Sequence, residues 1–175
     1  MNRRAALALT TMALVALAVA LPTGAAVAQE KQHVSIKGSG ENTKFTQQLN
    51  IDVGDAPNHI LRVFEDHTPC PSGCAVINGV KIVEIWERGV GDRIDMNGPA
   101  TIYDVYVGEN GDKFFVRNDG VVQNASGEFT ITQVGHITGG TGKFSAMQGI
   151  ARNVTNFSFK GMGASQTDID YWFAQ

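Results

Sequence analysis

Turn residues divide the chain beyond residue 58 into short segments in which apolar and polar side chains alternate. Strand-like segments cover 59–66, 80–88, 100–107, 113–117, 128–134, 150–159 and 166–173. Asn110-Gly111 lies between two of these segments, and an Asn-Gly pair in that position is typical of a tight β-hairpin. Beyond residue 28, no stretch of ten residues has a persuasive helical period. Because strands joined by short turns pair antiparallel, the sequence predicts an all-β barrel or sandwich.

Residues 1–28 have the three parts of a secretory signal peptide. Arg3 and Arg4 make a basic start, residues 5–21 are uncharged and rich in Ala, Leu and Val, and Ala26-Val27-Ala28 is a small-residue cleavage site. A retained membrane helix is the alternative, since the apolar run approaches the length that spans a bilayer. We expect cleavage after Ala28 and a secreted or periplasmic protein.

The remaining chain has the size of one ordinary domain. Residues 29–57 alternate only weakly, and we expect them to form an N-terminal arm of uncertain order. We expect residues 58–175 to form the β-barrel domain.

Charge and histidine spacing exclude several classes of partner. The chain has 14 Lys and Arg against 17 Asp and Glu, a formal net charge of −3. This balance argues against nucleic acid, and against an anionic membrane surface once the signal peptide is removed. The four histidines show no metal-ligand spacing, so we expect no metal, and no motif points to a cofactor.

The two cysteines lie close together in Cys70-Pro71-Ser72-Gly73-Cys74. In an exported protein such a pair forms a stable disulfide, and Pro71 and Gly73 allow the bend that it needs. A redox role is the alternative, although the spacing is C-x3-C and not the C-x-x-C of redox motifs. We expect a local staple on a loop.

A glycine-rich corner, Gly139-Gly140-Thr141-Gly142-Lys143-Phe144, separates two strand-like segments. It is not a phosphate-binding P-loop, because the residue after the lysine is Phe and not Ser or Thr. Glycine permits positive φ angles and close backbone approach, so the pattern predicts a tight corner in a sheet.

This corner, with Gly149 five residues further on, resembles the G-G-T-G-K-F-x-x-A-x-G signature of plant dirigent proteins and the related allene oxide cyclases. The resemblance extends loosely over residues 58–175, and the leader indicates a bacterial secreted member. It implies an eight-stranded antiparallel β-barrel of the calycin type, often a homotrimer. It also assigns structural roles to Gly139, Gly140, Gly142, Phe144 and Gly149.

The resemblance implies a lumen that binds a hydrophobic substrate for stereoselective coupling or cyclisation. Dirigent proteins carry a His-Asp pair on an early strand, and the matching place is Phe64-Glu65-Asp66. Asp66 fits this pair, whereas Glu65 stands where the histidine is expected.

Several side chains could supply charge or hydrogen bonds in such a lumen. A buried carboxyl with a raised pKa can act as an acid, and a tyrosine can bind a substrate oxygen. The candidate catalytic residues are Asp66, Glu84 and Tyr103. The candidate ligand-binding residues are Arg62, Phe64, Trp86 and Tyr106. For each of them, ordinary packing or exposure to solvent is the alternative.

Three functions agree with these observations. The first is a barrel that binds a small hydrophobic molecule. The second is an isomerase or cyclase that uses the same lumen without a cofactor. The third is an exported structural or interaction module whose barrel is filled by its own side chains. The number of strands does not decide among them, because a small barrel can be packed solid or hold one ligand.

Overall fold

The computed structural model describes residues 30–174, so the predicted signal peptide lies outside the described residues. These residues form ten strands and one short 3-10 helix. The elements are β1 (Gln32–Gly38), β2 (Lys44–Asp52), β3 (His59–Pro69), β4 (Ala75–Ile77), β5 (Val80–Ile94), β6 (Gly98–Gly108), β7 (Lys113–Ala125), β8 (Glu128–Gly140), η1 (Gly142–Phe144), β9 (Met147–Ser158) and β10 (Gly161–Phe173).

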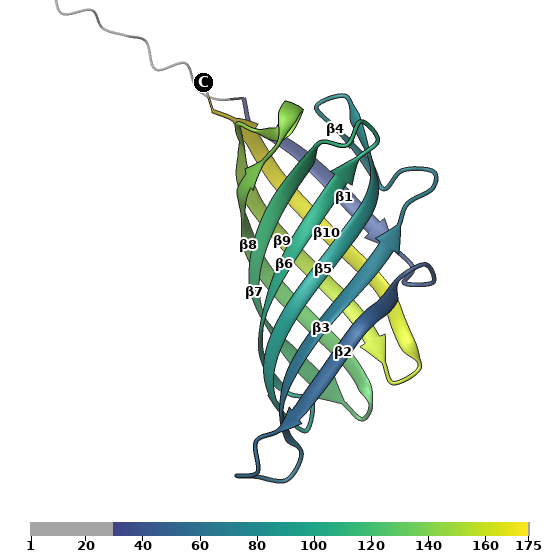
Figure 1. The fold of residues 1–175 in the computed structure, drawn as a ribbon, viewed down its shortest axis with the longest axis vertical. Coiled ribbons are helices and arrows are strands. Elements are labelled where there is room, and N and C mark those ends of the chain that lie inside the picture. The colour runs from purple at the N-terminus through teal and green to yellow at the C-terminus, as the bar shows by residue number, and fades with distance from the viewer. Residues whose placement is uncertain (1–29, 175) are drawn as a thin grey trace, which may run out of the picture.

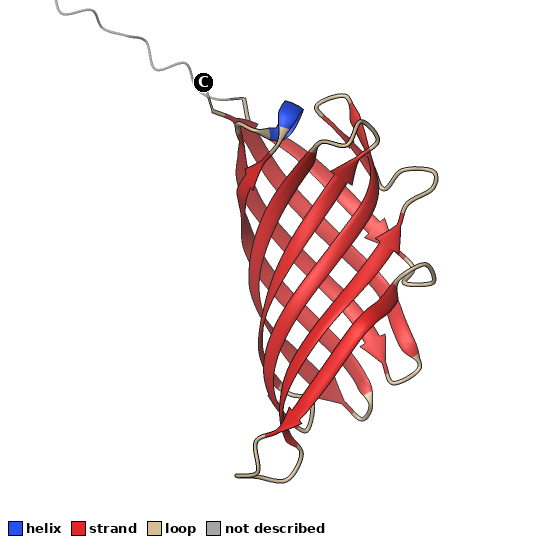
Figure 2. Cartoon of the chain, in the orientation of Figure 1, coloured by secondary structure: helices blue, strands red, loops and turns tan. Residues whose placement is uncertain are grey.

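All neighbouring strands pair antiparallel in one sheet that curls into a barrel (Figures 1 and 2). The strand order is β1-β10-β9-β8-β7-β6-β5-β3-β2, and the short β4 pairs with β5. The predicted all-β barrel is therefore confirmed. The sheet holds ten strands, not eight, and two of them, β1 and β2, come from the segment that we expected to form an arm.

The barrel has a seam where β1 and β2 form the two edges of the sheet. Within residues 30–174 no ladder of backbone hydrogen bonds joins these two strands. Side chains bridge the seam instead. Ile36 of β1 belongs to the same buried cluster as Ile77 of β4.

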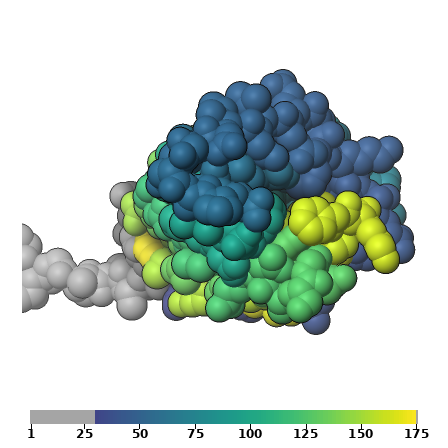
Figure 3. All heavy atoms as spheres, turned by 90° about the horizontal axis from the view of Figure 1, so that it is seen from below, coloured from purple at the N-terminus to yellow at the C-terminus, as the bar shows by residue number. Residues whose placement is uncertain are grey.

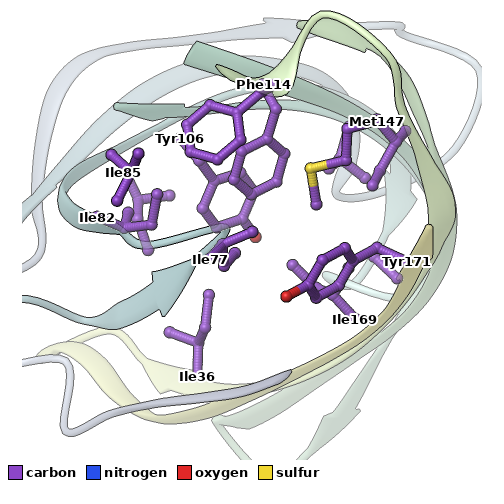
Figure 4. Close-up of a cluster of buried hydrophobic side chains, with 14 of the residues drawn as sticks. Ile36, Ile77, Ile82, Ile85, Tyr106, Phe114, Met147, Ile169 and Tyr171 are labelled. Atoms are coloured by element: carbon purple, nitrogen blue, oxygen red, sulfur yellow. The ribbon is translucent and has the colours of Figure 1, made fainter. Parts of the chain in front are cut away.

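The core consists of two apolar clusters at different heights in the barrel. The upper cluster contains Tyr106, whose ring stacks on Phe114 at a centroid distance of 4.4 Å (Figure 4). The lower cluster is built around Phe64, Ile102 and Phe129. Seen from the lower end, the atoms fill the outline and no open channel enters the barrel (Figure 3).

An irregularity in β5 decides which of its side chains enter the barrel. The sequence places Ile82, Glu84 and Trp86 on one face, but the register between β5 and β6 shifts between Ile82 and Glu84. A bulge of this kind adds one residue and reverses the alternation of the residues that follow. As a result Ile82 and Ile85 are both buried in the core, whereas Glu84 and Trp86 lie on the outer face.

The outer surface carries a row of apolar side chains across three strands. Leu49 lies opposite Val63, and Val63 lies opposite Val90. About half of each of these side chains is exposed. The homotrimer that the resemblance implies stays a prediction.

The glycine corner forms a tight connection from β8 to β9. Gly139 and Gly140 end β8, and Phe144 is fully buried, with its ring edge-on to Phe114 at 5.4 Å. Gly142 has φ of +51°, and a Cβ atom there would collide with the Asp112 carboxylate. That carboxylate accepts a hydrogen bond of 2.9 Å from the Lys143 backbone N–H.

Gly149 is needed for close approach and not for an unusual backbone angle. It lies opposite Tyr171 in the β9–β10 ladder. A Cβ atom at this position would collide with the carbonyl oxygen of Asp170.

We expect Gly142→Ala to destabilise the fold by about 1–3 kcal/mol, because the new side chain must adopt a left-handed conformation and displace Asp112. Urea unfolding of the mature chain measures this loss. Lys143→Ala is the matched control, because Lys143 is exposed at the same corner, and its effect should stay within about 0.5 kcal/mol. Equal stability of the two variants would contradict the assigned role of the glycine.

Candidate functional site

Three carboxyl side chains lie side by side inside the barrel. In the paired strands Asp66 of β3 lies directly opposite Glu87 of β5, and Glu87 lies directly opposite Asp104 of β6. Directly opposite residues on one face have Cβ atoms about 4.5–5.5 Å apart, and like charges in such pairs repel. We call Asp66, Glu87 and Asp104 the carboxyl row.

Asp66 is the least compensated member of the carboxyl row. It is only 1% exposed, and neither carboxyl oxygen has a hydrogen-bond partner. Burial, followed by the charges of Glu87 and Glu65, raises the pKa of Asp66 to about 8. Burial also raises the pKa of Glu87 to about 7. These two groups therefore hold protons in the neutral pH range, where most carboxyls are ionised.

Asp104 is partly compensated by its neighbours. One of its oxygens, Oδ2, accepts hydrogen bonds from Asn118 Nδ2 at 2.8 Å and from the Tyr106 hydroxyl at 3.4 Å. Its other oxygen has no partner. Burial and the charge of Glu87 hold the pKa of Asp104 well above its usual range, and the Asn118 hydrogen bond opposes this shift. Burial, followed by the charge of Asp104, also raises the pKa of Tyr106.

Uncharged polar groups continue this layer on the opposite wall of the barrel. Asn153 donates a hydrogen bond of 2.8 Å to the Thr167 hydroxyl, and Thr155 donates one of 3.0 Å to the Asn153 carbonyl. Gln133 of β8 lies directly opposite Asn153. Together with the carboxyl row and Asn118, these residues form a polar belt that separates the upper and lower apolar clusters.

A cavity of about 320 Å³ reaches this polar belt from the seam of the barrel. Its mouth is formed by the β1–β2 turn, the cysteine loop and the start of β10, and its inner wall includes Ile85, Glu87, Tyr106, Asn153 and Thr155. A second cavity of about 30 Å³ contains Asp66, Phe64 and Arg93 in its lining. Glu87, Thr155 and Met162 line both cavities, so the two lie back to back.

The cysteine loop shapes the mouth of the larger cavity. Cys70 and Cys74 form a disulfide with Cα atoms 5.4 Å apart, which confirms the predicted local staple. Both cysteines line the cavity. The disulfide therefore fixes one side of the entrance.

The structure places some of the predicted site residues inside the barrel. Asp66, Phe64 and Tyr106 are buried there. Arg62 lines the smaller cavity at the lower end, where its guanidinium donates hydrogen bonds to Gln48 and Asn50.

The other predicted site residues lie on the outer face. Glu84 accepts a hydrogen bond of 3.0 Å from the Trp86 indole N–H and lies 3.4 Å from His67 Nε2, while His67 stacks on Trp86. Tyr103 is 50% exposed. Since the inner and outer faces alternate along β6, Tyr103 and Tyr106 cannot share a lumen. Glu84, Trp86 and Tyr103 are thus not brought together with Asp66.

Two inner carboxyls, Glu87 and Asp104, were not among the predicted site residues. The alternation Ala100, Ile102, Asp104, Tyr106 was a usable signal for Asp104, because the other three side chains are apolar or aromatic. Glu87 lies on the same face of β5 as Ile85. The sequence alone does not show that this face points into the barrel, because it does not reveal the bulge.

Comparison with known proteins identifies the fold. No family model matches the chain, and no curated protein matches it. Among solved structures, the pterocarpan synthase dirigent protein GePTS1 matches with a TM-score of 0.50 and 13% identity over 84% of this chain and 90% of that chain. The fold is a dirigent-like barrel. The pterocarpan synthase dirigent protein PsPTS1 matches with a TM-score of 0.48 and 15% identity over 83% of this chain and 97% of that chain.

Residues 30–174 contain neither a metal-binding cluster nor a membrane-spanning helix. No group of three or more His, Cys, Asp or Glu side chains there is arranged to hold a metal ion. None of the helical structure in this range has the length and hydropathy to span a membrane.

We expect the carboxyl row to make the stability of the fold dependent on pH. The pKa of Asp66 is raised from 3.8 to about 8 in the folded state. Its contribution to the free energy of unfolding is therefore fully present below about pH 4 and is lost as the pH rises through 8. Asp66→Asn should therefore stabilise the fold at pH 9 by about 2–4 kcal/mol and change it little at pH 4.

Urea unfolding at the two pH values measures the difference. Glu41→Gln, which removes an exposed carboxyl from a turn, is the control and should have no such pH dependence. An effect of Asp66→Asn that is the same at both pH values would contradict the buried, protonated state of this group.

Proposed function

We propose that the chain is an exported barrel that binds a small organic molecule in the cavity at its seam. The observation that carries the proposal is the cavity of about 320 Å³ that ends on the polar belt. Ligand pockets commonly combine an apolar wall with a few convergent polar groups, and their volumes begin near 300 Å³. A barrel interior packed solid with side chains would favour the structural module instead.

The lining of the cavity supports a ligand with an apolar body and a polar end. Ile36, Ile85 and Met162 supply apolar surface, whereas Glu87, Tyr106 and Asn153 supply polar groups at the inner wall. We therefore propose an amphipathic ligand in place of the purely hydrophobic molecule expected from the sequence. Export is supported by the disulfide at the cavity mouth, since disulfides persist in oxidising compartments.

We expect Ser165→Phe to block this cavity. Ser165 lines the cavity next to its mouth, and a phenyl group there would occupy space that the ligand needs. The neutral dye N-phenyl-1-naphthylamine should bind the native chain saturably, with increased fluorescence, and bind Ser165→Phe at least about 10-fold more weakly, a loss of 1.4 kcal/mol.

The matched control is Gln166→Phe, which adds the same group to the exposed neighbouring residue and should leave dye binding unchanged. Saturable binding of equal strength by all three proteins would place the dye elsewhere on the surface. Absence of saturable binding by the native chain would contradict the proposed function.

An isomerase or cyclase is the second candidate, and the state of Asp66 and Glu87 favours it. A carboxyl that stays protonated near neutral pH can donate a proton to a bound substrate and take one back. Glu87 lines both cavities, and Asp66 lies directly opposite it. A cyclase would further use the cavity to hold a flexible substrate in its reactive conformation.

We expect Glu87→Gln and Asp66→Asn to lower turnover of such a substrate by about 100-fold or more, because general acid–base groups contribute factors of about 10²–10⁴. The substrate would be sought among small molecules that co-purify with the native chain, with product formation followed by chiral chromatography. Glu109→Gln, in the exposed β6–β7 turn, should not change turnover. Unchanged turnover in both inner variants would exclude these acid–base roles.

A further inference from the structure

When its carboxyls are ionised, the polar belt contains more hydrogen-bond acceptors than donors. Of the six buried side-chain atoms without a partner among the described residues, four are oxygens inside the barrel: both carboxyl oxygens of Asp66, Oδ1 of Asp104 and Oδ1 of Asn118. The other two are Nε of Arg93, at the lower end, and Nε2 of His67, on the outer face. The available donors nearby, Asn118 Nδ2 and the Tyr106 hydroxyl, both go to Asp104 Oδ2. Since buried polar atoms without partners are rare in folded proteins, this surplus indicates missing donors.

Within residues 30–174, no cationic side chain forms an ion pair with the carboxyl row. The ion pairs formed within residues 30–174 involve other acids, such as Glu65 with Arg88 and Asp170 with Arg152. A fixed row of three acids with no counter-charge is costly when the acids ionise, because each charge is removed from water without compensation.

The two inner arginines belong to the lower end of the barrel. Arg62 lies over the rings of Phe45 and Phe64, 5.4 and 5.7 Å from their centroids. Arg93 is 3% exposed, and burial followed by the charge of Arg62 lowers its pKa to about 10. Both arginines line the smaller cavity together with Asp66 and Glu87. Phe64 lies between Arg62 and Asp66 along β3, and neither arginine forms an ion pair with the carboxyl row.

We propose that the ligand of the seam cavity is an organic cation, a primary amine whose ammonium group donates hydrogen bonds to Glu87 and Asp66. This inference rests on the proposed binding function and names the chemical class of its ligand. Glu87 lines the seam cavity, and Asp66, with two unpartnered oxygens, lies opposite Glu87 in the lining of the smaller cavity. An ammonium group at the junction of the two cavities brings three N–H donors and one positive charge to these carboxyls. The apolar part of the amine would lie in the larger cavity against Ile36, Ile85 and Met162.

Other ligand classes fit the same surface less well. An anion would add a further negative charge beside the carboxyl row. A neutral alcohol supplies one donor and no charge, and it leaves most of the unpartnered oxygens as they are. The comparison of an amine with an alcohol of the same shape therefore isolates the interaction that the inference depends on.

Binding of a cation should be linked to the release of protons. The titratable groups on the inner faces of the strands around the cavity are Arg62, Asp66, Glu87, Arg93, Asp104, Tyr106 and Tyr171. Lys37, which is exposed, also lines the larger cavity. Of these, Asp66 and Glu87 exchange protons near neutral pH. An ammonium group favours their ionised forms, so affinity should rise from pH 5 to pH 8, where an amine with a pKa near 10 is still protonated.

The test uses calorimetry of the mature chain with 2-phenylethylamine, 2-phenylethanol and phenylacetate. We expect the amine to bind at least about 10-fold more tightly than the alcohol at pH 8 and to lose most of this advantage at pH 5. The anion should bind most weakly. Titrations in buffers of different ionisation enthalpy should show net proton release for the amine alone.

Two variants separate the charge interaction from the shape of the cavity. Asp66→Asn and Glu87→Gln should each reduce the preference for the amine to about threefold or less while binding of the alcohol is retained. If one variant does not fold, the other still gives the result. Ser165→Phe should weaken both probes together, because it fills the space that they share.

The possible failures are distinguishable. If N-phenyl-1-naphthylamine binds in the cavity but amine and alcohol bind equally, or if neither variant alters the preference, the inference is overturned and the binding function stands. If neither the dye nor any of the three probes binds, the proposed function fails and the inference fails with it.

Discussion

The bulge in β5 determines what the inside of this barrel contains. Without the register shift between Ile82 and Glu84, the strand would turn either Ile82 or the pair Ile85 and Glu87 outward. With it, both isoleucines enter the upper apolar cluster and Glu87 lies between Asp66 and Asp104. A single extra residue thus supplies apolar packing and the central acid of the carboxyl row. This fits the general occurrence of bulges beside functional sites, where they redirect a side chain.

The polar belt that results divides a core that would otherwise be continuous. Apolar side chains of the same volume would stabilise a barrel of this size better than unpartnered acids, because unpaired buried charges oppose folding. The two apolar clusters above and below compensate for this cost, with large rings such as Phe114, Phe129 and Phe144 almost fully buried. Perturbed carboxyls in a cleft of an otherwise well-packed protein are a common mark of a functional site. Here three adjacent positions of the barrel interior carry buried carboxyls where apolar side chains would stabilise the fold better. This favours a functional over a purely structural role for them.

Much of the fold follows from local sequence, whereas the site depends on long-range register. Alternation and turn chemistry were sufficient for most strands, and the Asn110-Gly111 hairpin and the corner at Phe144 lie where they were expected. Asp66 was identified through the resemblance and lies inside the barrel. Glu84 was preferred to Glu87 because a bulge leaves no clear mark in a single sequence. The seam cavity also could not be predicted, since its wall combines the turn after β1, the cysteine loop and β10, which are far apart along the chain.

The missing ladder between β1 and β2 sets how molecules can exchange with the interior. In most of the barrel wall, an opening would require several backbone hydrogen bonds to break together. At the seam the two edges are held by side-chain packing such as that of Ile36 in the cluster that contains Ile77, so they can separate while the ladders of the other strands stay intact. Entry and release can then be fast in a barrel whose global unfolding is slow. The lifetime of a bound molecule is thereby uncoupled from the lifetime of the fold.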